Sequence, residues 1–339
     1  MAVSMRSRGR LLRALLSHAP SLGLLPSPRA RPQGISAFVR AKNEEEWIEP
    51  CVRSIAPAVD EVVVVDNGST DSTPERLRAL ERELAPKVRL FRLPGADYCA
   101  LSEFALSRAR FRWLLKWDAD FIAYDRGSRA AVNLRARILG LPEHRYAHIH
   151  LTCIEVMGDL WHQLPGQETR DDPFVTTASP WLRYVRVDRR VAAGGLEGIQ
   201  GILRDDPDAR YAFHFEDIRV PLCYRVLTWT EPFLVHVNID SDLRMYLRDS
   251  WADWEENPAL QRRFPGLEAY ALARARDAWG VQTLEEAAEE FGRRVCERLI
   301  PYSRERWGEL PEALRPHLER PLYRVEYKDG RPWRRAHGP

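Results

Sequence analysis

Runs of apolar residues alternate with amphipathic segments from residue 35 onward, and this alternation predicts strands and helices in turn. Strands are expected at 35–41, 61–66, 88–93 and 111–120, and the helices between them at 43–57, 73–84 and 98–110. The four valines at 62–65 show no alternation, which is typical of a strand buried on both faces of a parallel sheet. Strands separated by helices in this way predict an α/β fold with a doubly wound, mostly parallel sheet.

The hydrophobic spacing changes after residue 240. Apolar residues at intervals of three and four predict helices within 243–256, 267–280 and 283–300. Near the end, an Asp-Gly pair at 329–330 separates two strand-like runs, which indicates a hairpin. We therefore divide the chain into a basic N-terminal extension (1–34), an α/β domain (35–240) and a helical C-terminal extension (241–339).

The N-terminal extension differs in composition from the rest of the chain. Residues 1–34 contain six Arg and no carboxylate, and the first acid of the chain is Glu44. Its leucines are interrupted by Pro20 and Pro26, so the apolar stretch is too short to span a bilayer. Three interpretations remain, in this order of preference: a disordered extension, a basic amphipathic helix on an anionic lipid surface, or a targeting peptide.

Composition excludes several classes of partner and site. A formal net charge of +2 gives no reason to expect nucleic acid as the partner. Five scattered cysteines without a C-x-x-C pair argue against a disulfide framework and a zinc cluster, and indicate free thiols in a reducing compartment. Only four of the 51 basic residues are Lys, a bias typical of a GC-rich bacterial coding sequence. We expect a cytoplasmic protein, with peripheral contact at the inner face of the plasma membrane through residues 1–34 as an alternative.

Polar residues gather where three of the predicted strands end. These clusters are Arg40 to Asn43, Asp66 to Asp71, and Asp118 to Asp120. Because ligands of doubly wound sheets bind outside the carboxyl ends of the strands, the three clusters should form one site. The second cluster lacks G-x-G-x-x-G, and no G-x-x-x-x-G-K-[ST] occurs, so neither a dinucleotide fingerprint nor an ATPase-type phosphate loop is present.

These clusters carry a resemblance to a known family. The segments VRAKNEEEWIEPCVRSI, VDEVVVVDNGSTDST and FALSRARFRWLLKWDADF resemble the family 2 glycosyltransferases, which have the GT-A fold. In that family the first strand ends near an Asn-Glu pair, the second ends in V-D-D/N-G-S-T-D, and the fourth ends in D-x-D. The resemblance covers about residues 35–125 and implies that this part is the nucleotide-sugar half of a catalytic domain, with 126–240 as the acceptor half.

The resemblance implies a metal-dependent, inverting transfer from a nucleotide-diphosphate sugar. The departing diphosphate develops negative charge, which Mn²⁺ or Mg²⁺ can stabilise when it is held by carboxylates. Asp120 is expected to bind the metal, and Asp118 is expected to bind the metal or the ribose. Because we place both acids on one strand, alternation should turn them to the same side, with Ala119 facing away.

The resemblance also implies where the nucleotide lies. Asp66 is expected to accept a hydrogen bond from the nucleobase, and the backbone near Ala41 and Asn43 should line the pocket. His236 ends a short apolar strand, where it either reaches the metal or diphosphate or is structural. The nucleotide-sugar-binding set expected in this way is Arg40, Ala41, Asn43, Glu44, Asp66, Asn67, Gly68, Lys116 and Asp118.

The general base that deprotonates the acceptor is harder to assign. A carboxylate about ninety residues beyond D-x-D is the usual candidate by resemblance, which favours Asp217, with its neighbour Glu216 as an alternative. Glu197 lies in a glycine-rich loop that an acceptor could approach closely. Further candidates for binding the sugars are the acids Glu155 and Asp159 and the side chains Trp161, His162 and Trp181.

We therefore expect a glycosyltransferase that acts on a glycan, lipid or small-molecule acceptor. One alternative is a nucleotidylyltransferase, which shares the sheet and the metal carboxylates. That class normally has a glycine-rich loop with Arg or Lys after the first strand, and VRAKNEEEW lacks one. The other alternative is a non-catalytic relative that binds nucleotide sugars, because D-x-D can bind a donor without catalysis.

Overall fold

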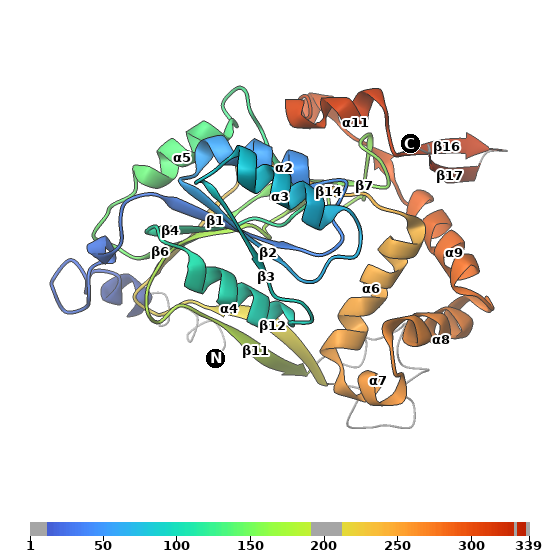
Figure 1. Cartoon of the computed structure of the whole chain (residues 1–339), viewed down its shortest axis with the longest axis horizontal. Coiled ribbons are helices and arrows are strands. Elements are labelled where there is room, and N and C mark those ends of the chain that lie inside the picture. The colour runs from blue at the N-terminus through green and yellow to red at the C-terminus, as the bar shows by residue number, and fades with distance from the viewer. Residues whose placement is uncertain (1–11, 191–211, 329–330, 337–339) are drawn as a thin grey trace.

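A seven-stranded sheet forms the centre of the protein. The computed structural model describes residues 12–190, 212–328 and 331–336. The strand order is β13–β6–β10–β4–β1–β2–β3. Figure 1 shows β1, β2, β3, β4 and β6 of this sheet at the centre of the molecule. Only β10 runs antiparallel to its neighbours, whereas the pairs β1–β2, β2–β3, β1–β4 and β6–β13 are parallel. The predicted doubly wound, mostly parallel sheet is therefore confirmed. Its strands are β1 (Ile35–Ala41), β2 (Glu61–Asp66), β3 (Val88–Arg92), β4 (Trp113–Lys116), β6 (Ala147–Leu151), β10 (Phe174–Thr177) and β13 (Arg225–Trp229).

Helices cover both faces of this sheet. On one face Val62 and Val64 pack in a core cluster with α2 (Ile48–Ile55), α3 (Thr73–Glu83) and α5 (Ala131–Leu139). On the other face Val63 and Val65 pack with α4 (Tyr98–Arg108). Every residue of β2 is buried, as the unalternating valines predicted. Two buried faces fix the sheet, and its strand ends are therefore rigid supports for side chains.

A second sheet of four strands lies next to the D-x-D residues. Its order is β5–β14–β7–β9, with β5 (Phe121–Ala123), β14 (Leu234–Asn238), β7 (Cys153–Met157) and β9 (Thr169–Arg170). The chain passes from the first sheet to the second in a turn at residues 117–120, which the bond from the Phe121 N–H to the Asp118 carbonyl closes. The prediction of one strand over 111–120 was wrong. Asp118 and Asp120 are oriented by a turn between two sheets, not by alternation along a strand.

The first predicted helix starts later than expected. It begins at Ile48 instead of residue 43, where Asn43 has a left-handed φ of 57° that an α-helix does not contain. Glu44 and Glu45 donate their backbone N–H groups to Thr73 and Asp71 at the start of α3. Ser72 occupies the N-cap position of α3 but makes no capping bond, since its hydroxyl donates to the Glu45 carboxylate. The loops after β1 and β2 are thus cross-linked by side chains.

The remaining elements lie mostly in the C-terminal third, where the predicted helices are present. α6 packs with α8 and α9 around Tyr246 and Ala271. The final hairpin pairs β16 with β17, with Lys328 opposite Arg331. The elements are β8 (His162–Gln163), β11 (Arg183–Arg190), β12 (Ala212–Arg219), α6 (Asp242–Glu256), α7 (Pro258–Arg263), α8 (Leu267–Trp279), α9 (Leu284–Cys296), β15 (Ile300–Pro301), α10 (Arg304–Trp307), α11 (Arg315–Glu319), β16 (Tyr323–Lys328) and β17 (Arg331–Ala336), with short 3₁₀ turns at Pro28–Ala30, Ala56–Ala58 and Glu312–Leu314.

The described part of the N-terminal extension lies against the α/β domain. Arg13 donates to the carbonyls of Pro221 and Tyr224, and Arg31 donates to the carbonyl of Ala109. The Tyr146 hydroxyl donates to the carbonyl of Pro26. Residues 12–31 are therefore held by specific contacts, unlike the disordered extension that the composition favoured. Within the described ranges, no helix combines the length and apolar character needed to cross a membrane.

The C-terminal hairpin anchors α6. Arg334 of β17 has a side chain only 2% exposed, and its Nη2 lies 2.5 Å from the Asp242 carboxylate in the first turn of α6. The Asp242 carboxylate fits here only because residue 292 of α9 is a glycine. A Cβ atom at that position would lie 2.5 Å from Asp242 Cγ. The position of α6 thus depends on contacts from two later elements.

Gly292→Ala should lower the stability of the protein, although Gly→Ala inside a helix normally stabilises by about 0.5–1 kcal/mol. The added methyl group must push the Asp242 carboxylate off Arg334, and overpacking of this kind costs roughly 1–3 kcal/mol. The measurement is the free energy of unfolding in urea. Gly266→Ala is the matched control, because a Cβ atom there meets nothing within 4 Å. A more stable Gly292→Ala protein would contradict the anchoring role.

Candidate active site

Asp118 lies between two cationic side chains at the end of β4. Its carboxylate is 2.8 Å from Lys116 Nζ and 3.1 Å from Arg40 Nη2. Burial alone would raise the pKa of Asp118, but Lys116 and Arg40 outweigh it and hold that pKa well below its usual range. Lys116 also contacts Asp172 at 3.3 Å, so burial, which would lower its pKa, is outweighed and the pKa is raised. Asp118 is a fixed anion whose oxygens are already partnered.

Asp120 faces a histidine from the second sheet. His236 Nε2 of β14 lies 3.1 Å from Asp120 Oδ2, and His236 Nδ1 lies 2.7 Å from Glu155 Oε2 of β7. All three side chains are buried. Burial would lower the pKa of His236, but the two carboxylates raise it to about 10. The imidazole therefore carries a positive charge between two acids that come from different elements.

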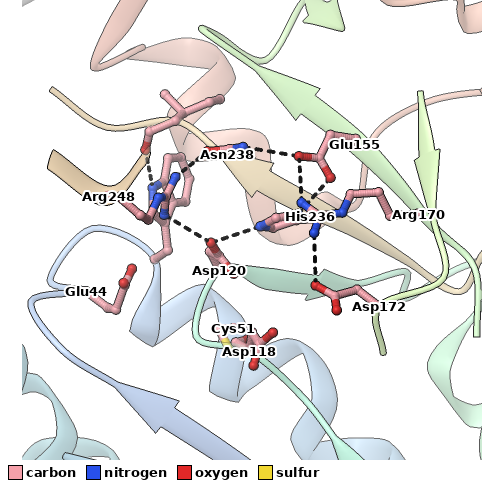
Figure 2. Close-up of polar contacts among 12 residues, drawn as sticks. Glu44, Cys51, Asp118, Asp120, Glu155, Arg170, Asp172, His236, Asn238 and Arg248 are labelled. Carbon is pink, nitrogen blue, oxygen red and sulfur yellow. Dashed lines mark hydrogen bonds and ion pairs between the residues drawn. The ribbon is translucent and has the colours of Figure 1, made fainter. Parts of the chain in front are cut away.

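A network of charged and polar groups surrounds these pairs (Figure 2). Arg170 joins them, with its guanidinium 3.8 Å from Glu155 and 3.5 Å from Asp172. Asn238 of β14 donates to Glu155 at 3.2 Å and accepts from Arg248 of α6. Arg248 Nη1 in turn lies 3.7 Å from Asp120 Oδ2. Figure 2 shows these side chains pointing toward one another from the four-stranded sheet, from the turn at residues 117–120 and from α6.

The loop after β1 is shaped by the loop after β2. Asn43 has a φ of 57°, a left-handed conformation that Asn tolerates better than most residues. Its side chain accepts from the Thr70 N–H at 2.8 Å, and its own N–H donates to Ser69 Oγ at 2.8 Å. Gly68 has a φ of +74°, and a Cβ there would lie 2.9 Å from Pro94. Both loops are therefore closely defined at the sheet edge.

Asp66 and Asn67 end β2 with different partners. Asp66 Oδ1 accepts from both the N–H and the hydroxyl of Ser69, at 3.0 and 2.6 Å. Asp66 Oδ2 is buried without a hydrogen bond, and its ion-pair contact is with Arg92 Nε at 3.5 Å. The Asn67 side chain donates to the Ala96 carbonyl and accepts from the Ala96 N–H. Asp66 thus keeps an acceptor oxygen for a ligand, whereas the Asn67 side chain holds a turn.

Glu44 belongs to the same edge of the sheet. Its carboxylate is 3.0 Å from Arg244 of α6, which also contacts Asp240 at 2.8 Å. Burial, followed by the nearby Asp120, raises the pKa of Glu44 to about 8. Because Arg244 also donates to the Lys42 carbonyl, α6 is held directly against the loop after β1.

The structure gathers some of the predicted residues and separates others. Arg40, Lys116, Asp118, Asp120 and His236 form one cluster, and Glu155 joins it as the partner of His236. Glu216 and Asp217 lie in β12, but their side chains are outside the described part of the chain, as is the whole of Glu197.

Asp159 and its neighbours do not join the cluster. Asp159 is buried and accepts from Val325 of the C-terminal hairpin at 2.8 Å, while its other oxygen contacts His162 at 2.7 Å. Trp161 packs beneath Arg324, and Trp181 packs against Tyr146. Asp159 thus joins His162 to the C-terminal hairpin, and the sugar-binding role suggested for these two residues stays a prediction.

The donor atoms around Asp120 fit a divalent cation. In the described ranges no group of three or more His, Cys, Asp or Glu side chains is arranged as a ready ligand set. Asp120 and His236 Nε2 would nevertheless provide one carboxylate and one imidazole side by side, once a cation has displaced the proton from Nε2. The hydrogen bond that His236 Nδ1 donates to Glu155 is the arrangement that orients metal-binding histidines. Mg²⁺ and similar ions commonly take one or two protein ligands and complete their shell with water and substrate phosphate.

Sequence reasoning missed four residues of the network, namely Arg170, Asp172, Asn238 and Arg248. Asn238 follows His236 by two residues on β14, so strand alternation turns it to the same side, and this signal was readable. Asp172 precedes β10 in an ordinary polar loop, and Arg248 is one of several charged residues on an amphipathic helix. Nothing in the local pattern marks either one.

Comparison with known proteins finds similar sequences for the N-terminal part of the α/β domain. The sequence profile of glycosyl transferase family 2 matches residues 36–131. An uncharacterized glycosyltransferase of Rickettsia felis is 40% identical over 86 residues, which are 25% of this chain and 28% of that protein. The lipopolysaccharide core biosynthesis glycosyltransferase LpsC of Rhizobium meliloti is 33% identical over 86 residues, covering 25% of this chain and 31% of LpsC. The chain thus matches less than a third of the length of these relatives.

Solved structures with a similar chain path were also found. S. aureus TarS 1–349 has a TM-score of 0.36 at 14% identity, covering 88% of this chain and 95% of that one. The mannosyltransferase PcManGT from Pyrobaculum calidifontis, in complex with GDP-Man and Mn²⁺, has a TM-score of 0.36 at 16% identity, covering 84% of each chain.

The segment matched by the family profile begins in β1 and ends at the start of α5. It contains the strand ends that carry Asp66, Asp118 and Asp120. Residues 36–131 therefore resemble glycosyl transferase family 2.

Proposed function

We propose that this protein transfers a sugar, with inversion, from a nucleotide-diphosphate donor to a glycan, lipid or small-molecule acceptor. The observation that supports it most directly is the pairing of Asp120 with His236, whose other ring nitrogen is held by Glu155. This pair lies at the carboxyl end of β4, at the same sheet edge as Asp66 at the end of β2. A cation site beside a nucleoside site is the arrangement that a sugar-diphosphate donor requires.

Each part of the edge has a role in this proposal. Asp66 offers its Oδ2 atom to the nucleobase, next to the backbone of Ala41, with which it pairs across β1 and β2, and of Asn43. Asp118, held rigid by Arg40 and Lys116, faces the ribose. Asp120 and His236 would hold Mn²⁺ or Mg²⁺, which when bound neutralises the charge that develops on the departing diphosphate. The protein's own contribution is to fix these groups before the donor arrives.

The acceptor is assigned more broadly. LpsC is named for lipopolysaccharide core biosynthesis, and 86 residues of this chain are 33% identical to it. This similarity favours a cell-surface glycan as the acceptor. The acceptor would contact residues after 126, because the candidate bases Glu197, Glu216 and Asp217 belong to that part of the chain.

Asp120→Asn should abolish metal-dependent binding of the donor while leaving the fold intact. The amide removes the carboxylate charge, so the loss should exceed the roughly 10–100-fold that a mutated outer-shell partner costs. The measurement is calorimetric titration of UDP and GDP with and without Mn²⁺, with circular dichroism as the check on folding. Asp125→Asn is the control, because that acid is solvent-exposed and pairs with Arg126 away from the site. Unchanged Mn²⁺-dependent binding in Asp120→Asn would remove the metal from the proposal.

Asp217→Asn should lower turnover by roughly 10²–10⁴-fold, as loss of a general base does, without changing donor affinity. A base acts on the acceptor hydroxyl in the transition state and contributes little to binding the donor. Glu197→Gln is the competing variant, since one carboxylate occupies the face opposite the diphosphate. Full transfer by Asp217→Asn together with loss in Glu197→Gln would move the base to the glycine-rich loop. Activity in both variants would exclude both residues.

We also propose that the N-terminal extension contacts an anionic lipid surface. Leu22 and Leu24 are 70% and 73% exposed, and Leu222 of the α/β domain is 48% exposed. Arg13 of the extension donates to the carbonyl of Pro221, the residue that precedes Leu222. Exposed leucines within 43 residues that carry no acid suit a negatively charged membrane.

The variant Leu22→Asp with Leu24→Asp should bind anionic vesicles at least about tenfold more weakly, since each leucine that enters the interface contributes on the order of 1.5 kcal/mol. Co-sedimentation with phosphatidylglycerol vesicles is the measurement, and phosphatidylcholine vesicles report the charge dependence. Val132→Asp on α5, where the side chain is 52% exposed, is the control. Equal sedimentation of the double variant and the unmodified protein would exclude this surface as the contact.

A further inference from the structure

α6 brings an arginine from the C-terminal extension to the D-x-D turn. Arg248 reaches from the second turn of α6 to Asp120, with 3.7 Å between Nη1 and Oδ2 (Figure 2). Its Nη2 donates to the Asn238 side chain, which is bonded to Glu155. Arg248 therefore touches the same network that holds His236, although it comes from a part of the chain outside the family match.

The other cations beside the D-x-D turn have closer acidic partners. Lys116 and Arg40 lie 2.8 and 3.1 Å from Asp118, and Arg244 lies 2.8 Å from Asp240. Arg170 comes nearest to Arg248 in this respect, but it contacts two acids, Asp172 at 3.5 Å and Glu155 at 3.8 Å. Arg248 has a longer contact, and it shares Asp120 Oδ2 with His236. Its side chain is 39% exposed, whereas that of Arg40 is 11% exposed. Arg248 is thus a cation with a weakly held partner and access to solvent at the mouth of the site.

A metal on Asp120 would change the balance around Arg248. The carboxylate charge that attracts the guanidinium would then be shared with a divalent cation, so the two cations would repel each other. An anionic ligand between them removes this conflict, and an arginine fork fits two phosphate oxygens better than an ammonium group does. The ligand that satisfies both is the diphosphate of the donor.

We propose that Arg248 binds the diphosphate of the nucleotide sugar, so that the C-terminal helical extension completes the donor site. This inference rests on the proposed function and adds a residue to it. The anchoring of α6 supports it, because the Asp242–Arg334 pair and the Arg244–Glu44 pair hold the first turn of the helix, which precedes Arg248. Asn238 fixes the guanidinium from the strand side.

The test separates the diphosphate from the rest of the nucleotide. In Mn²⁺, the affinities of UDP, GDP, CDP, ADP and dTDP and of the matching monophosphates are measured by calorimetry for the full-length protein. For the diphosphate that binds, Arg248→Ala should weaken binding by about 10–100-fold, the range of a lost charge-assisted hydrogen bond. The monophosphate should lose less than about threefold, because it lacks the second phosphate. The affinity for Mn²⁺ alone should stay the same or rise, since a competing cation has left Asp120.

Two further variants make the result specific. Arg248→Lys keeps the charge without the fork, so it should recover part of the diphosphate affinity. Arg276→Ala removes an exposed arginine from α8 in the same extension and should change nothing. Equal diphosphate affinity in Arg248→Ala and the unmodified protein would overturn the inference. A parallel loss of Mn²⁺, monophosphate and diphosphate binding would also overturn it, by giving Arg248 a purely structural role. An unmodified protein that binds no nucleotide with Mn²⁺ would instead overturn the proposed function.

Discussion

The site depends on one buried histidine held between two acids. His236 lies in the second sheet, and its imidazole connects Glu155 of that sheet to Asp120 in the turn that leaves the first sheet. Each of the three charges is buried, so each requires the others. Removing one partner from a buried ion pair commonly costs about 3–5 kcal/mol, because the remaining charge is left without compensation. This constraint aligns the two sheets and brings the D-x-D turn to a defined place.

Much of the α/β domain could be predicted from the sequence, because local patterns report burial directly. The unalternating valines of β2 identified a strand covered on both faces, and the polar residues at the ends of β1, β2 and β4 identified the edge where a ligand binds. The turn at Asp118 and Asp120 was less predictable. An apolar run looks the same whether it is one strand or two short strands in different sheets, and only the tertiary pairing of β5 with β14 distinguishes them.

Residues that contact each other from distant parts of the sequence could not be recognised from the local sequence pattern. Arg248 lies on a helix whose apolar spacing predicts packing alone, and its relation to Asp120 depends on how α9 and the C-terminal hairpin place α6. Asp159 shows how tertiary contacts can occupy an acid that looks free in the sequence. It lies near Trp161 and His162, which suggested a sugar subsite, but one of its oxygens accepts from the Trp161 N–H and the other from the Val325 N–H of the C-terminal hairpin. The sequence shows which polar side chains are present, whereas only the fold shows whether their polar atoms are already bonded within the protein.

The central claim is that Asp120 and His236 form the cation end of a donor site. Anomalous diffraction at the manganese edge from crystals grown with Mn²⁺ and a nucleoside diphosphate tests it most directly. We predict one peak about 2.0–2.2 Å from an Asp120 carboxylate oxygen and from His236 Nε2, with phosphate oxygens completing the shell. A peak bound elsewhere, or a diphosphate bound with His236 still paired to Asp120, would contradict the account.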